Sequence, residues 1–137
     1  MSRPRRAEVA TKLLVRIKLQ GGGVFGPGKA ELLECVDRLG SISAAAREMC
    51  MSYRQAWKLI ETMNDVFRER VVETSQGGAH GGGATLTNVG KKLLDCYRSM
   101  QQKATHSTID DLETITTLLA LKTARPVPKR PPGRRSV

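Results

Sequence analysis

The glycine-rich stretch GGGVFGPGKAELLE at residues 21–34 contains most of a phosphate-binding loop. Gly23, Gly28 and Lys29 fit the spacing G-x-x-x-x-G-K, in which backbone N–H groups and the lysine surround the phosphates of a nucleotide. The full motif continues with a serine or threonine that binds Mg²⁺, but this chain has Ala30 there. A nucleotide hydrolase also needs a metal-binding carboxylate on a second strand, and no such strand follows. We therefore expect a glycine turn in which Pro27 fixes the start of a helix.

The cysteines and histidines do not form a catalytic or metal-binding set. Cys35, Cys50 and Cys96 are odd in number and far apart, without the C-x-x-C spacing of metal sites. The chain has two histidines, and neither forms a Cys–His or Ser–His pair at a useful spacing. We expect three buried free thiols in a cytoplasmic protein, and neither an enzyme nor a metal site. No run of about 18 apolar residues is present and the N-terminus lacks an apolar signal region, so we expect no membrane segment.

The positive charge is concentrated at the two ends of the chain. The 137 residues carry a net charge of +10, and 12 of the 23 Lys and Arg residues lie in residues 1–18 and 122–137. Basic tails favour a polyanionic partner, either a nucleic acid or an anionic membrane surface. With two Phe, two Tyr and one Trp, the chain has little material for the stacking platforms of single-strand and RNA binders. Duplex DNA is the expected partner.

Hydrophobic periodicity and capping residues predict the elements that position these residues. Apolar residues alternate before the glycine turn and recur at helical spacing after it. Ser41 and Ser52 each start a helix, and Ser52-x-x-Gln55 is a capping box. The expected elements are a strand at 12–20, helices at 29–39, 41–49 and 53–69, short strands at 71–74 and 84–87, and a long helix from 88 to about 104 with an extension to 121 that Ser107 or Thr108 caps.

The helix at 53–69 has a buried face and a charged face. Its expected core side chains are those of Ala56, Ile60, Met63 and Phe67. The opposite face has its cations in the N-terminal half and its acids in the C-terminal half, as a recognition helix requires when its N-terminal end enters the major groove. Tyr53 and Trp57 lie on its flanks, where we expect half-buried wedges; direct contact with bases is the alternative.

Two helices joined by a tight turn and followed by a hairpin are the winged helix-turn-helix arrangement. The stretch from FGPGKAELLE through GSISAAAR, SYRQAWKLIETMN and the glycine-rich SQGGAHGGG to LTNVG closely resembles the N-terminal DNA-binding domain of the ModE family of molybdate-responsive regulators. The likeness covers about 12–104 and, more loosely, extends to about Arg125. GSISAAAR and LTxxG are also similar to LysR-type regulators. One departure is Cys50, which stands where the helix-turn-helix turn usually has Gly. A left-handed residue there costs about 1 kcal/mol without glycine.

The resemblance implies a mainly α fold with a small β-hairpin wing and a long C-terminal dimerisation helix. We expect a basic tail at 1–11, the winged helix-turn-helix domain at 12–86, a helical dimerisation segment at 87–121 and a disordered, proline-rich basic tail at 122–137. As partners it implies double-stranded DNA, bound at a palindrome, and a second copy of the chain. The expected DNA-binding residues are Arg47, Ser52, Tyr53, Arg54, Gln55, Lys58, Ser75, Gln76 and His80. The expected dimerisation residues are Val89, Leu93, Tyr97, Met100, Leu112 and Ile115.

Several alternatives remain open at the level of sequence. Lys29 and the start of its helix could contact a DNA phosphate, His80 could be a solvated loop residue, and the long helix could fold back on its own domain. Family members that sense molybdate carry C-terminal oxyanion-binding domains. This chain has a basic tail instead, so we expect no cofactor and no molybdate sensing of the usual kind in it. A different class of function is a partner-binding or nucleoid-like winged helix whose tails bind DNA or RNA without sequence preference.

Overall fold

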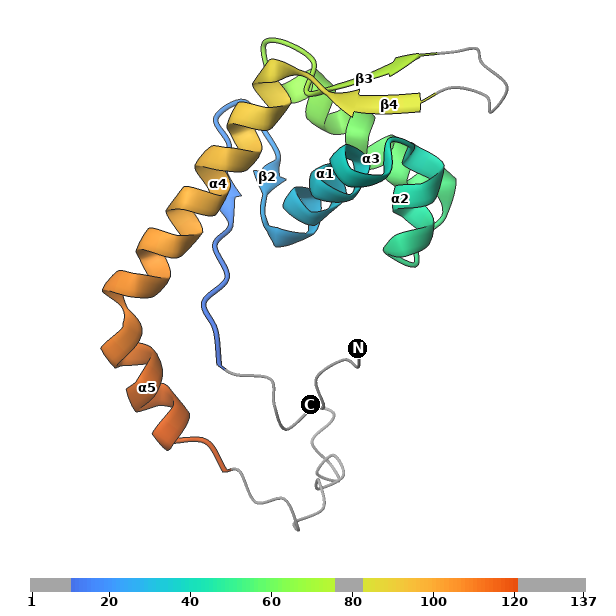
Figure 1. The fold of residues 1–137 in the computed structure, drawn as a ribbon. Helices are drawn as coiled ribbons and strands as arrows, with labels where there is room; N and C mark the ends of the chain where they lie inside the picture. The colour runs from blue at the N-terminus through green and yellow to red at the C-terminus, as the bar shows by residue number, and fades with distance from the viewer. Residues whose placement is uncertain (1–10, 76–82, 121–137) are drawn as a thin grey trace, which may run out of the picture.

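The structure is a computed structural model, and it describes residues 11–75 and 83–120. Within these ranges the chain forms a helical head with two small hairpins, from which two further helices extend as an arm (Figure 1). This agrees with the predicted winged helix-turn-helix followed by a long helix. In chain order the elements are β1 (Ile17–Lys18), β2 (Val24–Phe25), α1 (Pro27–Leu39), α2 (Ile42–Glu48), α3 (Tyr53–Val66), β3 (Val72–Ser75), β4 (Gly83–Leu86), α4 (Asn88–Ser107) and α5 (Ile109–Thr117).

The glycine-rich stretch is a turn between two short strands. β1 pairs antiparallel with β2, with Ile17 opposite Phe25, and the three glycines at 21–23 all have positive φ. The Lys29 side chain donates a hydrogen bond to the carbonyl oxygen of Val24 at 2.7 Å. This contact ties Lys29 to its own turn. Together with Pro27 in the first turn of α1, it supports the structural interpretation of the motif.

The first strand is shorter than its alternating pattern predicts. Only Ile17 and Lys18 pair with a neighbouring strand. The segment at 11–16 runs beside α4 (Figure 1), where Tyr97 Oη donates to the Val15 carbonyl at 2.6 Å and Gln101 Nε2 to the Leu13 carbonyl at 3.4 Å. The alternation of apolar residues at 12–20 therefore arises because one side of this extended segment packs on α4.

The core lies where α1, α2 and α3 meet the two hairpins and the first half of α4. Ala56, Ile60 and Met63 are buried as predicted. Phe25 and Tyr97 contact edge to face, with ring centroids 5.3 Å apart. The largest fully buried side chains are those of Phe25, Leu32, Leu33, Val36, Ile60, Val71, Val72 and Tyr97.

Two helix ends differ from the sequence prediction. α3 ends at Val66, because the chain at Phe67 is extended and turns back toward β3; Phe67 is half-buried and does not continue the helical core face. The long C-terminal helix is divided into α4 and α5 at Thr108, as predicted, although α4 continues to Ser107 instead of ending near 104. Thr108 is the N-cap residue of α5, but its hydroxyl donates back to the Ala104 carbonyl at 2.7 Å and makes no capping bond to α5.

Candidate nucleic-acid interface

The turn between α2 and α3 sets the angle between the two helices. Ser41 accepts a hydrogen bond from the Ala44 N–H at 3.0 Å and caps α2. At the other end of α2, Cys50 N–H donates to the Arg47 carbonyl and Met51 N–H to the Ala46 carbonyl, the paired bonds of a Schellman motif. Such a motif requires a left-handed residue, and Cys50 has φ 58°. The position at which the family usually has glycine is therefore a left-handed turn in this chain too.

The N-terminus of α3 is exposed and capped. Ser52 accepts a hydrogen bond from the Gln55 N–H at 3.0 Å, as the capping box predicts. Ser52, Tyr53, Arg54 and Gln55 are all exposed. A helix N-terminus of this kind offers free N–H groups and a partial positive charge to an anion such as a DNA phosphate.

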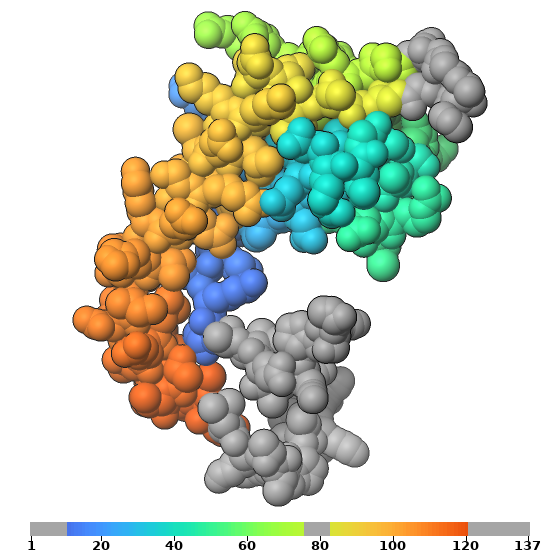
Figure 2. Space-filling model, in the orientation of Figure 1, coloured from blue at the N-terminus to red at the C-terminus, as the bar shows by residue number. Residues whose placement is uncertain are grey.

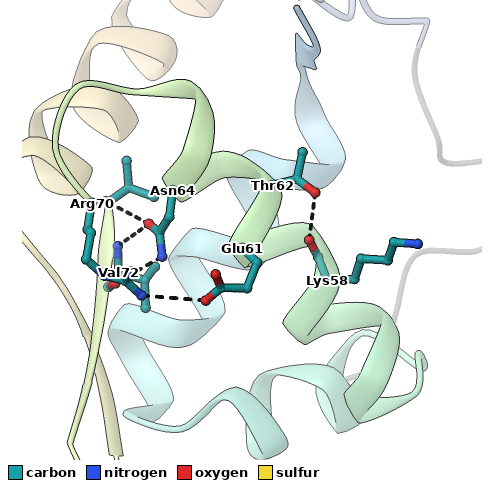
Figure 3. A network of polar contacts seen from close by, with 7 residues as sticks. Lys58, Glu61, Thr62, Asn64, Arg70 and Val72 are labelled. Atoms are coloured by element: carbon teal, nitrogen blue, oxygen red, sulfur yellow. Dashed lines mark hydrogen bonds and ion pairs between the residues drawn. The ribbon is translucent and has the colours of Figure 1, made fainter.

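The basic side chains around the N-terminal half of α3 form no ion pair with the described acidic residues. Arg47, Arg54 and Lys58 are exposed, and none takes part in an ion pair between residues that the structure describes. By contrast, Arg70 pairs with Glu61 near the C-terminal end of α3, at 3.5 Å (Figure 3). The charge polarity predicted for this helix is therefore present in three dimensions.

The two aromatic residues of α3 differ in how far they are buried. The Trp57 side chain is half-buried and packs against the core, as predicted. Tyr53 is 55% exposed, so the prediction that it is half-buried is wrong. Its position in the first turn of α3, beside Ser52 and Arg54, leaves its ring and hydroxyl accessible.

The wing is the hairpin of β3 and β4, with Val72 opposite Leu86 and Ser75 opposite Gly83. It is fixed to the head by the Ala84 N–H, which donates to the Gly40 carbonyl at 3.0 Å. Ser75 is exposed at the end of the described part of β3. Gln76 and His80, the other two predicted wing contacts, lie outside the described residues.

The predicted dimerisation residues fall into three environments. Met100 and Ile115 are 44% and 50% exposed, and Val89, Leu93 and Leu112 are half-buried. Tyr97 is 2% exposed and points into the head, which removes it from any accessible face of α4. Three further exposed apolar side chains lie on the arm outside the predicted dimerisation set, those of Ile109, Leu118 and Leu119. Ile109 and Leu118 belong to the apolar repeat of the sequence, and Leu119 does not.

The three thiols are not alike. Cys35 is buried, whereas Cys50 and Cys96 are exposed, so the prediction of three buried thiols is wrong. Burial raises the pKa of the Cys35 thiol, an effect that the neighbouring Arg38 guanidinium partly offsets.

Among residues 11–75 and 83–120 there is no group of three His, Cys, Asp or Glu side chains that could hold a metal ion. No helix in these ranges is long and apolar enough to cross a membrane.

Two structural residues were not identified from the sequence. Asn64 is buried and bonds to the segment before β3 (Figure 3), and Gly90 lies against the Val71 backbone. The sequence shows a polar residue, Asn64, next to the buried face of α3, and a glycine, Gly90, inside a helix. Neither feature indicates which backbone segment the residue contacts.

The sequence of this head is similar to those of bacterial regulators. Residues 28–91 match the family described as "Bacterial regulatory helix-turn-helix protein, lysR family". The chain is 38% identical over 112 residues to the transcriptional regulator ModE of Yersinia pestis, which covers 80% of this chain and 43% of that protein.

Two further relatives show the same pattern of coverage. The chain is 37% identical over 103 residues to the DNA-binding transcriptional dual regulator ModE of Escherichia coli K12, covering 73% of this chain and 39% of the relative. It is 42% identical over 80 residues to the molybdenum-pterin-binding protein MopB of Rhodobacter capsulatus, covering 58% of this chain and 30% of the relative. The resemblance seen in the sequence is confirmed, and the chain spans less than half the length of these relatives.

Proposed function

We propose, from the premise that residues 28–91 form a helix-turn-helix domain of the lysR-type bacterial regulators, that this chain is a sequence-specific DNA-binding transcriptional regulator. The observation that carries the proposal is the exposed, capped N-terminus of α3. There Arg54 and Lys58 have no acidic partner among the described residues. The body of the chain is close to neutral, whereas the N-terminal end of α3 carries cations and free N–H donors. Such a helix end fits the major groove of duplex DNA better than it fits a small substrate.

In this proposal the side chains of α3 divide between bases and phosphates. Arg54 makes a bidentate contact with guanine and Gln55 pairs with adenine, while Lys58, one turn further on, supports binding from the same face. Ser52, Tyr53 and the helix N-terminus bind phosphates, and Arg47 on α2 contacts the backbone. Ser75, with Gln76 and His80, follows the sugar-phosphate edge or the minor groove from the wing.

We further propose that the chain acts as a homodimer through α4 and α5. The apolar side chains of Met100, Ile109 and Ile115 support this, because they are exposed in the single chain. A twofold dimer places two recognition helices about 34 Å apart and binds a palindromic site. The proposed organisation is a basic tail at 1–11, the winged domain at 12–86, a dimerisation segment at 87–121 and a basic tail at 122–137.

The likeness to ModE and MopB supports a link to molybdenum metabolism. The names of these relatives describe transcriptional regulators and a molybdenum-pterin-binding protein. We propose that this chain, working in the cytoplasm, regulates transcription in response to molybdenum status without being an enzyme.

The test is selection of bound sequences from a random DNA duplex pool, at about 150 mM salt so that tail-driven binding is screened, with and without molybdate. We expect enrichment of a palindromic sequence. A change in the enriched sequence when molybdate is added would show directly that an oxyanion acts on this chain. If no sequence is enriched and binding is lost as the salt concentration rises, sequence-specific regulation is contradicted.

The concentration of cations in residues 1–18 and 122–137 favours one other function. In it, the winged domain binds a protein partner while the tails bind nucleic acid without sequence preference, as in nucleoid-associated proteins. The same selection experiment separates the two functions, because only the first enriches one sequence.

A further inference from the structure

Asn64 has the one buried polar side chain among the described residues, with 7% of its surface exposed. It lies in the last turns of α3, close to the buried Ile60 and Met63. A primary amide among apolar side chains is costly to bury unless its oxygen and nitrogen are hydrogen-bonded. Its partners therefore indicate why an amide is present at this position.

The amide of Asn64 binds the backbone that leads into the wing (Figure 3). Its Oδ1 accepts hydrogen bonds from the Val71 N–H at 2.7 Å and the Val72 N–H at 3.2 Å. Its Nδ2 donates to the Val72 carbonyl at 3.4 Å. One side chain of the recognition helix thus fixes the first residues of β3.

The start of α4 binds the same backbone segment. Thr87 N–H donates to the Val71 carbonyl at 3.0 Å, and Thr87 Oγ1 donates to the Arg70 carbonyl at 2.7 Å. A Cβ on Gly90 would lie 2.2 Å from the Val71 carbonyl oxygen, so α4 packs directly on this backbone. Residues 70–72 are therefore held from α3 by Asn64 and from α4 by Thr87.

We infer that Asn64 is a positioning residue for DNA binding, which sets the placement of the recognition helix α3 relative to the wing and to the arm that begins at α4. The inference rests on the proposed function. In a dimer joined through α4 and α5, the distance between two recognition helices depends on how each α3 is fixed to its own α4. Asn64 makes this connection through hydrogen bonds to the backbone, whereas Glu61, also on α3, reaches only the exposed side chain of Arg70. Asn64 need not touch DNA.

The first test needs no DNA and uses the two exposed native cysteines. Spin labels on Cys50, directly before α3, and on Cys96, in α4, report the α3–α4 distance, while the buried Cys35 stays unlabelled. Excess unlabelled chain suppresses distances between copies. We expect one narrow distance distribution in the parent chain and a broadened or shifted one in Asn64→Leu, which has similar volume but no hydrogen bonds. Asn64→Asp keeps the acceptor for the Val71 and Val72 N–H groups but loses the donor to the Val72 carbonyl, so its distribution should be narrower than that of Asn64→Leu.

A matched control separates positioning from simple loss of stability. Leu32→Ala removes a fully buried side chain of α1 that takes no part in the hydrogen bonds to residues 70–72, so it should lower stability and leave the distance distribution narrow. If Asn64→Leu behaves like Leu32→Ala in this measurement, Asn64 serves stability alone and the inference is overturned.

The second test uses the DNA selected above. With the fully folded chain, we expect Asn64→Leu to weaken binding by about tenfold and to shift the preferred spacing between half-sites while the base preference at each half-site stays. Asn64→Asp should bind with the parental spacing. An unchanged spacing preference in Asn64→Leu would overturn the inference. Failure of the parent chain to select any sequence would instead contradict the proposed function, and the spin-label result would still decide the role of Asn64.

Discussion

At the scale of single residues, the contrast between the two ends of α3 carries most of the functional argument. Arg54 and Lys58 are exposed and lie outside the ion pairs found in the described part of the chain, whereas Glu61 is paired with Arg70. A cation that is not neutralised within the protein keeps its full charge for a phosphate or a base edge. Arg54 is the better candidate for a base contact, because its planar guanidinium can bind guanine with two parallel bonds.

We predict that Arg54→Ala relaxes sequence preference. The loss of one bidentate contact should reduce discrimination at a single base pair by about 1–3 kcal/mol, while binding to unrelated duplexes changes little. Competition between the selected site and its single-base variants, followed by fluorescence anisotropy, measures this.

The matched comparison is the neutralisation of Lys129, Arg130, Arg134 and Arg135 in the C-terminal tail. Those changes should lower affinity for every sequence alike and reduce the salt dependence of binding. If both sets of changes had the same effect, the role assigned to α3 would be wrong.

Cys50 is the residue whose type conflicts most clearly with its backbone. Its φ of 58° lies in the left-handed region, which disfavours side chains with a Cβ. We predict that Cys50→Gly raises the free energy of unfolding by about 0.5–1 kcal/mol, because the relief of strain exceeds the added flexibility of the unfolded chain. Urea denaturation followed by circular dichroism measures the change.

Cys96→Gly is the control for the loss of a thiol. Cys96 is also exposed but lies inside α4, where replacing cysteine by glycine should lower stability by about 0.3–0.5 kcal/mol. Opposite signs for the two substitutions would establish backbone conformation as the cause. Equal destabilisation by both would show that the turn does not strain Cys50.

At the scale of elements, the junction of α4 with the wing depends on an unusually close approach. Thr87 caps α4 by accepting the Gly90 N–H at 3.0 Å, and Gly90 itself faces the Val71 carbonyl. The threonine and glycine of the LTNVG stretch thus have separate tasks, one as a helix cap and the other as space for a backbone.

We predict that Gly90→Ala lowers the free energy of unfolding by about 1–3 kcal/mol, because the new methyl group overlaps a backbone atom that cannot move without shifting β3. Thermal and urea denaturation provide the measurement. Gly28→Ala is the matched control, since Gly28 lies in the first turn of α1, where an added Cβ would meet nothing within 4 Å. It should leave stability unchanged or raise it slightly, and a similar loss in both variants would refute the steric explanation.

The order of the elements could be predicted from the sequence because each signal is local. Ser41, Ser52 and Thr87 each cap a helix within three residues of themselves, and Ala56, Ile60 and Met63 recur at the helical period. The strand at 12–20 and the end of α3 were predicted less well, because their limits depend on Tyr97, Gln101 and Asn64. These residues are distant in sequence or bond to backbone that periodicity does not identify.

For the candidate site too, local sequence patterns predict some features, whereas features that depend on contacts between distant residues are not predicted. An outward-facing charge such as Arg54 follows from the helical repeat alone. Whether an apolar residue of α4 faces outward depends on what covers it, and Tyr97 is covered by the N-terminal segment and Phe25. Met100, three residues later, is 44% exposed, although the next residue, Gln101, still bonds to the N-terminal segment.

At the scale of the whole molecule, the arm formed by α4 and α5 extends away from the head (Figure 2). α5 contains no buried residue, yet it displays Ile109 and Ile115, with Leu118 76% exposed just beyond its end. Apolar side chains at this spacing along an extended helix favour burial against another helix. The two-helix arm is therefore the part of the molecule best suited to contact a second copy.

We predict that Ile115→Lys raises the dissociation constant of the homodimer on the order of tenfold or more, because a charge replaces an apolar contact at the centre of α5. The head should remain folded, since Ile115 is half exposed and distant from the core. Sedimentation equilibrium of the full chain measures association, and thermal denaturation verifies the head.

Thr114→Lys is the matched control, because both substitutions place a lysine four residues after an aspartate, Asp110 for Thr114 and Asp111 for Ile115. This spacing favours the helix equally in the two variants, so they differ in which face of α5 receives the charge. Dimerisation through the apolar face requires that Thr114→Lys associates like the parent chain and that Ile115→Lys does not. If the parent chain itself sediments as a monomer, or both variants associate equally, α5 does not form the interface, and recognition of a palindrome must depend on another contact between copies.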